Sequence, residues 1–254
     1  MYFDTHAHYT DSKFDIDRLE LLGNLPAADV CAVIIPGCNA ADSADSVSLA
    51  EKFDNVYAAV GIHPEELPED FESDFSVISS LADNPKCIAI GEIGLDYYWD
   101  ASEKEKQKYV FRRQIELALT KNLPIIVHDR EAHGDCFDII REYEDLRGVF
   151  HCYSGSAEMA KELLKMGLYL GFDGPITYKN ARKALEVLSI CPPDRILIET
   201  DSPYLPPVPK RGTRNDSSNL KYIAEKIAEV KGVSAAFIEE ITAENAMTLF
   251  GISL

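Results

Sequence analysis

The chain has 254 residues, of which 46% are hydrophobic and 27% are charged, and these proportions exclude a disordered or low-complexity protein. Its 25 Lys and Arg against 43 Asp and Glu give a net charge of −18, which disfavours a protein that coats duplex DNA through many cation–phosphate contacts. No stretch approaches the roughly 20 apolar residues of a membrane helix, and residues 1–15 lack the pattern of a signal peptide. We expect a cytoplasmic protein without a membrane partner, whose six scattered cysteines are reduced.

Short apolar runs alternate with longer amphipathic segments along the chain. The expected strands are Tyr2–His8, Cys31–Pro36, Val56–Ile62, Cys87–Leu95, Pro124–His128, Val149–Cys152, Leu168–Phe172 and Arg195–Thr200. Several of these runs are apolar throughout, which is typical of parallel strands that helices bury on both faces.

The amphipathic segments predict helices between these strands. Ser102–Asn122 predicts a helix that opens with a capping box between Ser102 and Glu105. Ser234–Phe250 predicts a final helix with no strand after it. Eight β/α units of roughly 30 residues each account for the length, and no linker interrupts them. We therefore expect residues 1–254 to form one α/β domain, a (β/α)8 TIM barrel with an extra C-terminal helix.

The alternative fold is an open, doubly wound sheet. Such a sheet usually carries a Gly-rich phosphate-binding turn after its first strand. Here the first strand ends instead in the sequence DTHAH, residues 4–8. This motif favours the barrel.

Polar residues gather where the expected strands end. His6 and His8 are two residues apart in the first strand, so they face the same side. The polar residues that end the fourth, fifth, sixth and eighth strands are Glu92, His128, His151 and Asp201. In a barrel these ends converge on one face, where burying such a set unpaired costs several kcal/mol in total. The alternative is a group of separate polar residues that share no site.

Nitrogen and oxygen ligands without thiolates suit Zn, Mn, Mg, Fe or Ni. Six ligands are too many for one catalytic zinc ion, which typically keeps three and a water. We expect two divalent ions (Mg, Mn or Zn) with a bridging carboxylate, which polarise a phosphoryl or carbonyl oxygen and generate hydroxide from water. Asp201 can both bind an ion and accept the proton of that water as a general base.

The motifs resemble those of the TatD family of metal-dependent hydrolases, commonly called TatD DNases, within the amidohydrolase-like barrels. The matching segments are DTHAH (4–8), GIHP (61–64), GEIGLD (91–96), HDR (128–130), FHCYSG (150–155), ETDSPYL (199–205) and RGTRN (211–215). Asn245 and Phe250 match the C-terminal helix of the family. The resemblance therefore covers the whole chain in the right order.

The resemblance implies a role for each polar residue at the strand ends. The ligands that it implies for one ion are His6, His8 and Asp201. Those that it implies for the second ion are His128 and His151, with Glu92 bridging the two. One departure is visible, because the family usually has proline two residues after the loop asparagine, Asn215, where this chain has Ser217.

The resemblance also implies that His63 and Arg130 contact the substrate phosphate. Considered alone, His63 could equally order its loop through hydrogen bonds. Arg130 offers a planar fork that suits phosphate, but it could instead pair with Asp129 or Glu131.

Two further clusters have open interpretations. The basic cluster is Lys210, Arg211 and Arg214. It could meet a nucleic-acid backbone or be a solvated loop. The aromatic cluster is Tyr97, Tyr98 and Trp99. It could stack on bases or be a packed loop. His133 receives no role.

By this resemblance we expect a metal-dependent hydrolase of ester bonds, and above all a deoxyribonuclease. It would hydrolyse phosphodiester bonds through metal-bound hydroxide and act like a 3′–5′ exonuclease. Its nucleic-acid partner would be single-stranded DNA or DNA ends, and we expect no obligate protein partner. One alternative is a hydrolase acting at carbon, such as a D-aminoacyl-tRNA deacylase or a small-molecule amide or lactone hydrolase. Another is a non-catalytic metal- or nucleic-acid-binding protein, which the complete ligand set disfavours.

Overall fold

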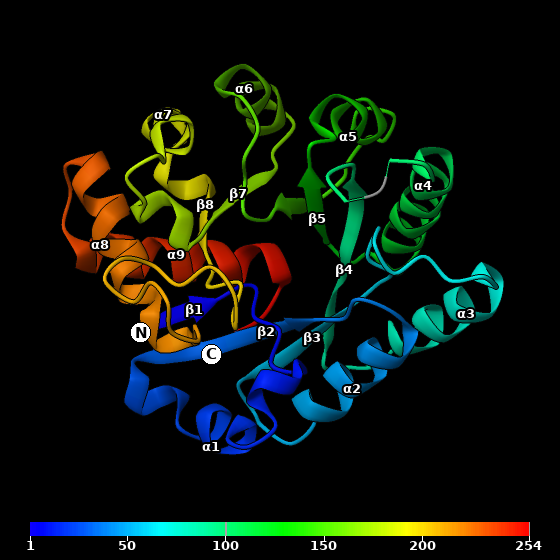
Figure 1. The fold of residues 1–254 in the computed structure, drawn as a ribbon, viewed down its shortest axis with the longest axis horizontal. Coiled ribbons are helices and arrows are strands. Elements are labelled where there is room, and N and C mark those ends of the chain that lie inside the picture. The colour runs from blue at the N-terminus through cyan, green and yellow to red at the C-terminus, as the bar shows by residue number, and fades with distance from the viewer. Residues whose placement is uncertain (100, 254) are drawn as a thin grey trace.

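The computed structural model describes residues 1–99 and 101–253. Eight parallel strands follow one another in chain order around a nearly closed barrel (Figure 1). The strands are β1 (Tyr2–Asp4), β2 (Val30–Pro36), β3 (Val56–Val60), β4 (Cys87–Asp96), β5 (Ile125–Arg130), β6 (Gly148–Phe150), β7 (Tyr169–Phe172) and β8 (Ile196–Ile198). The expected α/β TIM-barrel class is confirmed.

The first and last strands meet through the residues that follow them. The N–H of Thr5 donates to the carbonyl of Ile198 at 3.2 Å, and the N–H of Asp201 donates to the carbonyl of His6 at 2.9 Å. The strand predicted over Tyr2–His8 therefore ends at Asp4. Separate hydrogen bonds to β2, to β8 and to the segment after β8, rather than a regular ladder, hold residues 5–8 in place.

Helices surround the barrel and separate successive strands (Figure 1). They are α1 (Arg18–Gly23), α2 (Ala40–Ala50), α3 (Phe71–Leu81), α4 (Lys104–Lys121), α5 (His133–Ile140), α6 (Ala157–Lys165), α7 (Arg182–Ile190), α8 (Leu220–Lys231) and α9 (Ala235–Phe250). Among the described residues, no helix is both long enough and apolar enough to cross a lipid bilayer.

The predicted capping box at the start of α4 is wrong. The N-cap residue is Glu103, one position later than Ser102, and its side chain makes no capping hydrogen bond. Gln107 anchors this end of the helix instead. Its side-chain amide accepts from the N–H of Asp96 and donates to the carbonyl of the same residue, at 2.9 Å each. This exchange ties α4 to the end of β4.

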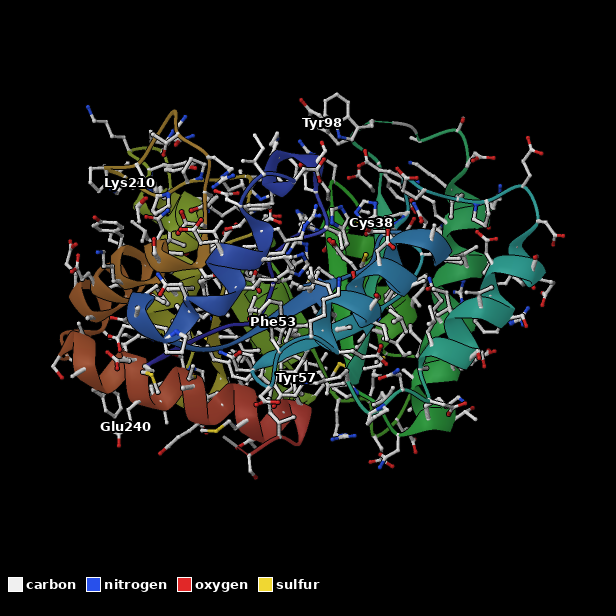
Figure 2. The ribbon with its side chains drawn as sticks, turned by 90° about the horizontal axis from the view of Figure 1, so that it is seen from below. Cys38, Phe53, Tyr57, Tyr98, Lys210 and Glu240 are labelled. Carbon is white, nitrogen blue, oxygen red and sulfur yellow. The ribbon has the colours of Figure 1, made fainter. Side chains whose placement is uncertain are left out.

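The extra helix α9 closes the barrel end at which the strands begin. Its apolar residues pack on Phe3 and on the other side chains that fill the barrel interior. The rings of Phe3 and Phe250 lie 6.5 Å apart, and the amide of Asn245 donates to the carbonyls of Pro193 and Ile196 at the start of β8. Figure 2 shows α9 along one end of the molecule and the loops of Tyr98 and Lys210 at the other. The end at which the strands finish, called the mouth below, stays open.

Candidate metal centre

Four side-chain atoms form a compact set at the mouth beside β1 and β8. The Nε2 atoms of His6 and His8 lie 3.1 Å apart. Asp201 Oδ1 lies 3.8 and 3.3 Å from these two nitrogens, and Glu92 Oε2 lies 3.3 and 3.7 Å from them. Four ligands placed about 2.1 Å from a tetrahedral ion are themselves about 3.4 Å apart. The spacing of this set therefore suits one divalent ion.

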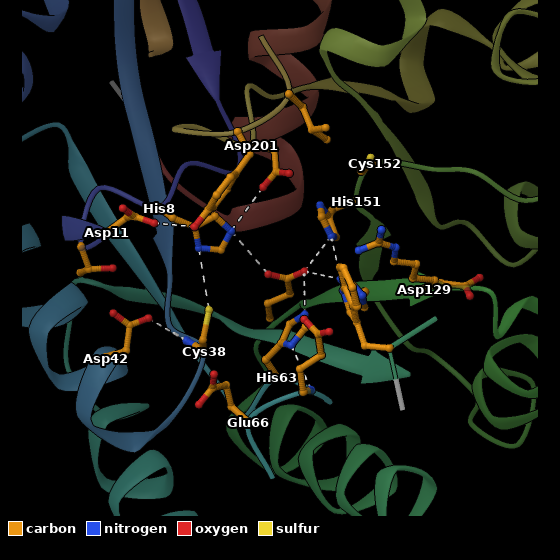
Figure 3. A pocket seen from close by; sticks show the side chains of 18 of the residues that line it. His8, Asp11, Cys38, Asp42, His63, Glu66, Asp129, His151, Cys152 and Asp201 are labelled. Carbon is orange, nitrogen blue, oxygen red and sulfur yellow. Dashed lines mark hydrogen bonds and ion pairs between the residues drawn. The ribbon is translucent and has the colours of Figure 1, made fainter. Parts of the chain in front are cut away.

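The other oxygen of Glu92 faces a second set of imidazoles. Glu92 Oε1 lies 2.7 Å from His128 Nδ1 and 2.7 Å from His151 Nε2, and these two nitrogens are 3.3 Å apart. The carboxylate thus stands between two groups of nitrogen atoms. The structure brings together all six residues that the strand ends place at the mouth, and Figure 3 shows His8, His151 and Asp201 turned toward one centre.

The buried carboxylates at this centre stay charged because imidazoles surround them. Burial by itself raises the pKa of the Glu92 carboxyl, but electrostatic interactions with the surrounding imidazoles, His151 above all, and the hydrogen bond with His128 outweigh burial and hold that pKa well below its usual range. Burial acts on Asp201 in the same way, and its hydrogen bond and charge interaction with His8 leave its pKa lowered. Both groups are therefore carboxylates, the form that binds a cation.

His63 lies beside the second set of imidazoles, and a backbone hydrogen bond fixes which of its ring nitrogens carries the proton. Its Nδ1 accepts the backbone N–H of Glu65 at 3.1 Å, so in the neutral ring Nε2 carries the proton. This Nε2 lies 3.7 Å from Glu92 Oε1. Burial and the charge of His128 lower the pKa of His63 to about 3. The residue therefore presents a neutral N–H to the centre. Its position beside Glu92 and His128 would suit an ion, but in this tautomer it donates a hydrogen bond instead.

Two acidic residues that received no role from the sequence support the candidate ligands. Asp96 Oδ2 lies 3.0 Å from His128 Nε2, which leaves His128 Nδ1 free to face Glu92. Glu199 is fully buried, and its Oε1 accepts the N–H of Cys152 and lies 3.7 Å from His151 Nδ1. That distance is too long for a hydrogen bond, so Glu199 acts on His151 through its charge alone, whereas Asp96 is bonded to His128. Carboxylates that hold the outer nitrogen of a metal-binding histidine fix its ring and raise its basicity. The sequence signal was their spacing, since Asp96 is four residues after one candidate ligand and Glu199 is two before another.

The sites expected to contact substrate lie on an open cavity of about 800 Å³ at the mouth. Arg130, at the end of β5, is exposed and lines this cavity. The salt bridge considered for it, to Asp129 or Glu131, is absent among the described residues. His63 lines the same cavity. Both residues therefore lie where a substrate would enter.

The basic cluster does not act as one unit. Arg214 forms a bidentate ion pair with Asp17. Arg211 lies over the ring of Tyr178, 4.1 Å from its centroid. Lys210 is exposed. Only Arg211 and Lys210 remain available to a ligand on this loop.

The loop in which Ser217 replaces the family proline is built on hydrogen bonds. The Ser217 hydroxyl donates to Asp4 Oδ2 at 2.7 Å and lies 2.9 Å from the hydroxyl of Tyr9. Asn215 is buried, and its amide donates to the carbonyls of Thr200 and Tyr204. Burial raises the pKa of Asp4 to about 7. A proline at position 217 could not bond to Asp4 or Tyr9. In this chain Ser217 therefore attaches the loop to β1, and Asn215 attaches it to the segment after β8.

A parallel α/β barrel whose mouth holds buried imidazoles and carboxylates is the architecture of a metal-dependent hydrolase. The family model for TatD related DNases matches residues 3–251. The chain belongs to the TatD family of metal-dependent hydrolases.

Similar proteins span the full length of the chain. An uncharacterized metal-dependent hydrolase, YabD of Bacillus subtilis, is 46% identical over 100% of both chains. The 3′–5′ ssDNA/RNA exonuclease TatD of Escherichia fergusonii is 34% identical over 99% of both. The crystal structure of YJJV, a TatD homologue of Escherichia coli K12, superposes with a TM-score of 0.93 and 29% identity, covering 99% of this chain and 98% of that one.

Proposed function

We propose that this protein is a phosphodiester hydrolase that acts on single-stranded nucleic acid or on strand ends, with two divalent ions at the mouth. His6, His8 and Asp201 would hold one ion. His128 and His151 would hold the other, and Glu92 would bridge the two. The positions of the two Glu92 oxygens between separate groups of nitrogen atoms support this assignment.

When bound, such ions polarise a phosphoryl oxygen and lower the pKa of water toward neutrality. The side chains of the protein then supply proton transfer and positioning. Asp201 is a carboxylate at the edge of the centre, so it can accept the proton of the attacking water. His63 presents a neutral Nε2–H that can donate to a substrate oxygen without changing the charge of the site.

The open cavity beside the centre is the observation that most supports a phosphodiester as the substrate. It joins the candidate ligands directly to Arg130, whose guanidinium can donate two parallel hydrogen bonds to a phosphate. The net charge of −18 opposes a long duplex, whereas a strand end needs only local cations. The exonuclease named among the relatives acts on single-stranded DNA and RNA, which agrees with this choice.

A hydrolase acting at carbon is the second candidate, because the same ions can polarise a carbonyl oxygen. A small amide or lactone would favour a closed apolar pocket. The observed cavity is open, and the side chains on it that can donate to a phosphate oxygen include Arg130 and the neutral His63. This lining favours the phosphodiester.

The test is a parallel activity screen with Mg, Mn and Zn. The substrates are single-stranded DNA, single-stranded RNA, blunt duplex DNA and aminoacyl-tRNA, with labels at either end of the DNA and RNA strands to reveal the polarity of cleavage. We expect turnover of single strands from the 3′ end and at least tenfold slower turnover of the blunt duplex, as an order-of-magnitude expectation for a site with few phosphate contacts. Deacylation of aminoacyl-tRNA without cleavage of any strand would refute the proposal.

A further inference from the structure

Two exposed aromatic rings and one arginine form a corner beside the metal centre. Tyr98 is 54% exposed and Trp99 is 66% exposed. Their rings are nearly perpendicular, with centroids 4.8 Å apart. The guanidinium carbon of Arg130 lies 4.0 Å from the centroid of the Tyr98 ring and 5.4 Å from that of Trp99. Tyr98, Trp99 and Arg130 are called the aromatic corner below.

The aromatic corner is not part of the packed core. The neighbouring Tyr97 shows what a packed aromatic looks like here, since its hydroxyl donates to Asp135 at 2.7 Å and the amine of Lys104 lies over its ring. Tyr98 and Trp99 show no comparable burial. Large apolar surface left in water next to a catalytic cavity is typical of a ligand-binding surface.

The position of the aromatic corner is fixed relative to the candidate ligands. The N–H of Tyr98 donates to Asp96 Oδ1 at 2.8 Å, and the other oxygen of Asp96 holds His128. The N–H of Tyr97 donates to the carbonyl of Arg130 at 2.9 Å. One carboxylate thus anchors both the corner and a candidate metal ligand. Trp99 and Arg130 also line the same cavity as His128.

The charges around the cavity direct an anionic strand toward this side. The carboxylates that line the cavity after β1, β2 and β3 are Asp11, Asp42, Glu65 and Glu66. They would repel phosphates. Arg130, at the end of β5, is the only Lys or Arg among the described residues that line the cavity, and its guanidinium has no ion-pair partner among residues 1–99 and 101–253. Its neighbour Asp129 is paired with His133. The favourable path for a strand therefore passes over the aromatic corner.

We propose that the aromatic corner binds the nucleotide next to the scissile phosphate, with its base stacked on Trp99 and its phosphate held by Arg130. The inference rests on the proposed function, because it concerns the same strand. Stacking on an aromatic ring accepts any base, so the corner selects unpaired bases and not a sequence. A base inside an intact duplex has both faces covered and cannot bind in this way.

Trp99 is the only tryptophan of the chain, so its fluorescence reports directly on this site. The first experiment titrates the metal-loaded protein with a phosphorothioate oligothymidylate, whose slow cleavage permits an equilibrium measurement. We expect quenching of the fluorescence in the wild type. The affinities of all variants are compared by the fluorescence anisotropy of a dye-labelled copy of the same oligonucleotide, because the Trp99 variants lack the tryptophan signal. Trp99→Ala should weaken binding about 5- to 100-fold, the usual effect of removing one stacking partner. Trp99→Phe should retain most of the affinity. The matched control is Phe237→Ala, which removes an aromatic that is 41% exposed on α9, far from the mouth.

The second experiment pairs Trp99→Ala with strands that lack one base near the 3′ end. If the base stacks on Trp99, the loss in kcat/KM caused by the substitution should disappear when that base is missing. Strand cleavage with unchanged fluorescence, and with equal kcat/KM for the wild type and Trp99→Ala, would overturn the inference while the proposed function stands. Quenching without cleavage would support the corner and refute the proposed hydrolysis. If neither occurs, both are overturned.

Discussion

Asp201 could act as a metal ligand, as the general base, or as both, and one substitution distinguishes these roles. Its carboxylate lies 3.3 Å from His8 Nε2, and its pKa stays low. Asp201→Asn keeps the size and one oxygen ligand but removes the basic oxygen. We expect turnover to fall by about 10²- to 10⁴-fold, the usual contribution of a general base. Steady-state kinetics with metal occupancy measured on the same sample checks this.

The matched substitution is His128→Asn, on the other side of Glu92. It removes one candidate ligand of the second ion, so excess metal should restore part of its activity. Excess metal should not restore Asp201→Asn. If Asp201→Asn keeps near-normal turnover at full occupancy, the proton acceptor is another group, and Asp201 is at most a ligand.

Asp96 is a positioning residue for His128. Asp96→Ala removes the oxygen 3.0 Å from His128 Nε2 and frees the ring to rotate. We expect affinity for the second ion to weaken by about 10- to 100-fold, as is usual when such a partner is lost. Metal titration followed by calorimetry measures this. Asp96→Asn can still accept through its amide oxygen and should lie between the two. Equal affinity in all three proteins would remove Asp96 from the site.

The sequence predicted which polar side chains gather at the mouth better than it predicted the contacts that orient them. The six polar residues lie near the ends of apolar strands or just after them, so the barrel topology alone brings them to one end. Asp96 and Glu199 were missed because topology does not say which nitrogen of an imidazole faces inward. The inward nitrogen depends on the rotation of the side chain, which only the structure reveals. For His128 it is Nδ1, which lies 2.7 Å from Glu92.

At the scale of elements, α9 stabilises the barrel from the end opposite the centre. Phe250 is only 6% exposed and packs near Phe3 in the interior. Phe250→Ala should lower the free energy of unfolding by about 3–5 kcal/mol, the usual cost of such a cavity. Phe237 lies on the same helix and is exposed, so Phe237→Ala should change it by less than about 0.5 kcal/mol. Urea denaturation compares the two.

Activity provides the second measurement for Phe250→Ala. Because α9 closes the far end of the barrel, the fraction of Phe250→Ala that remains folded should keep its kcat. A loss of kcat in fully folded protein would mean that α9 influences the mouth, contrary to the separation in Figure 2.

The sequence also predicted the order and type of the elements, but not where they end. Residues 5–8 look like a strand in the sequence, yet β1 has only three residues. Its neighbour β8 is equally short, so hydrogen bonds of the residues that follow the two strands close the barrel there. The start of α4 was misplaced because the pattern of Ser102 and Glu105 is local. The bond of Gln107 to Asp96 is a long-range contact that local patterns do not reveal.

At the scale of the whole molecule, bound metal should stabilise the fold. Without ions, four imidazoles and two carboxylates stand together, buried or half-buried. Each ion that binds only the folded state adds about 2.7 kcal/mol at 100 times its dissociation constant. We expect chelation to abolish activity and to lower the urea midpoint, and metal analysis at saturation to approach two ions per chain. Full activity with a single ion at saturation would contradict the bridged arrangement.

The last prediction concerns salt. Each phosphate of a single strand that a protein cation neutralises contributes about −0.7 to the slope of log K against log salt. Few cations lie free around this cavity, and the chain carries a charge of −18, so the slope at constant metal concentration should lie near −1 to −2. Arg130→Ala should make it shallower by about 0.7. Arg214→Ala is the matched control. Because Arg214 is already paired with Asp17, this substitution should leave the slope unchanged. A slope as steep as that of a basic-groove protein, or an equal effect of both substitutions, would show that the strand binds by another route.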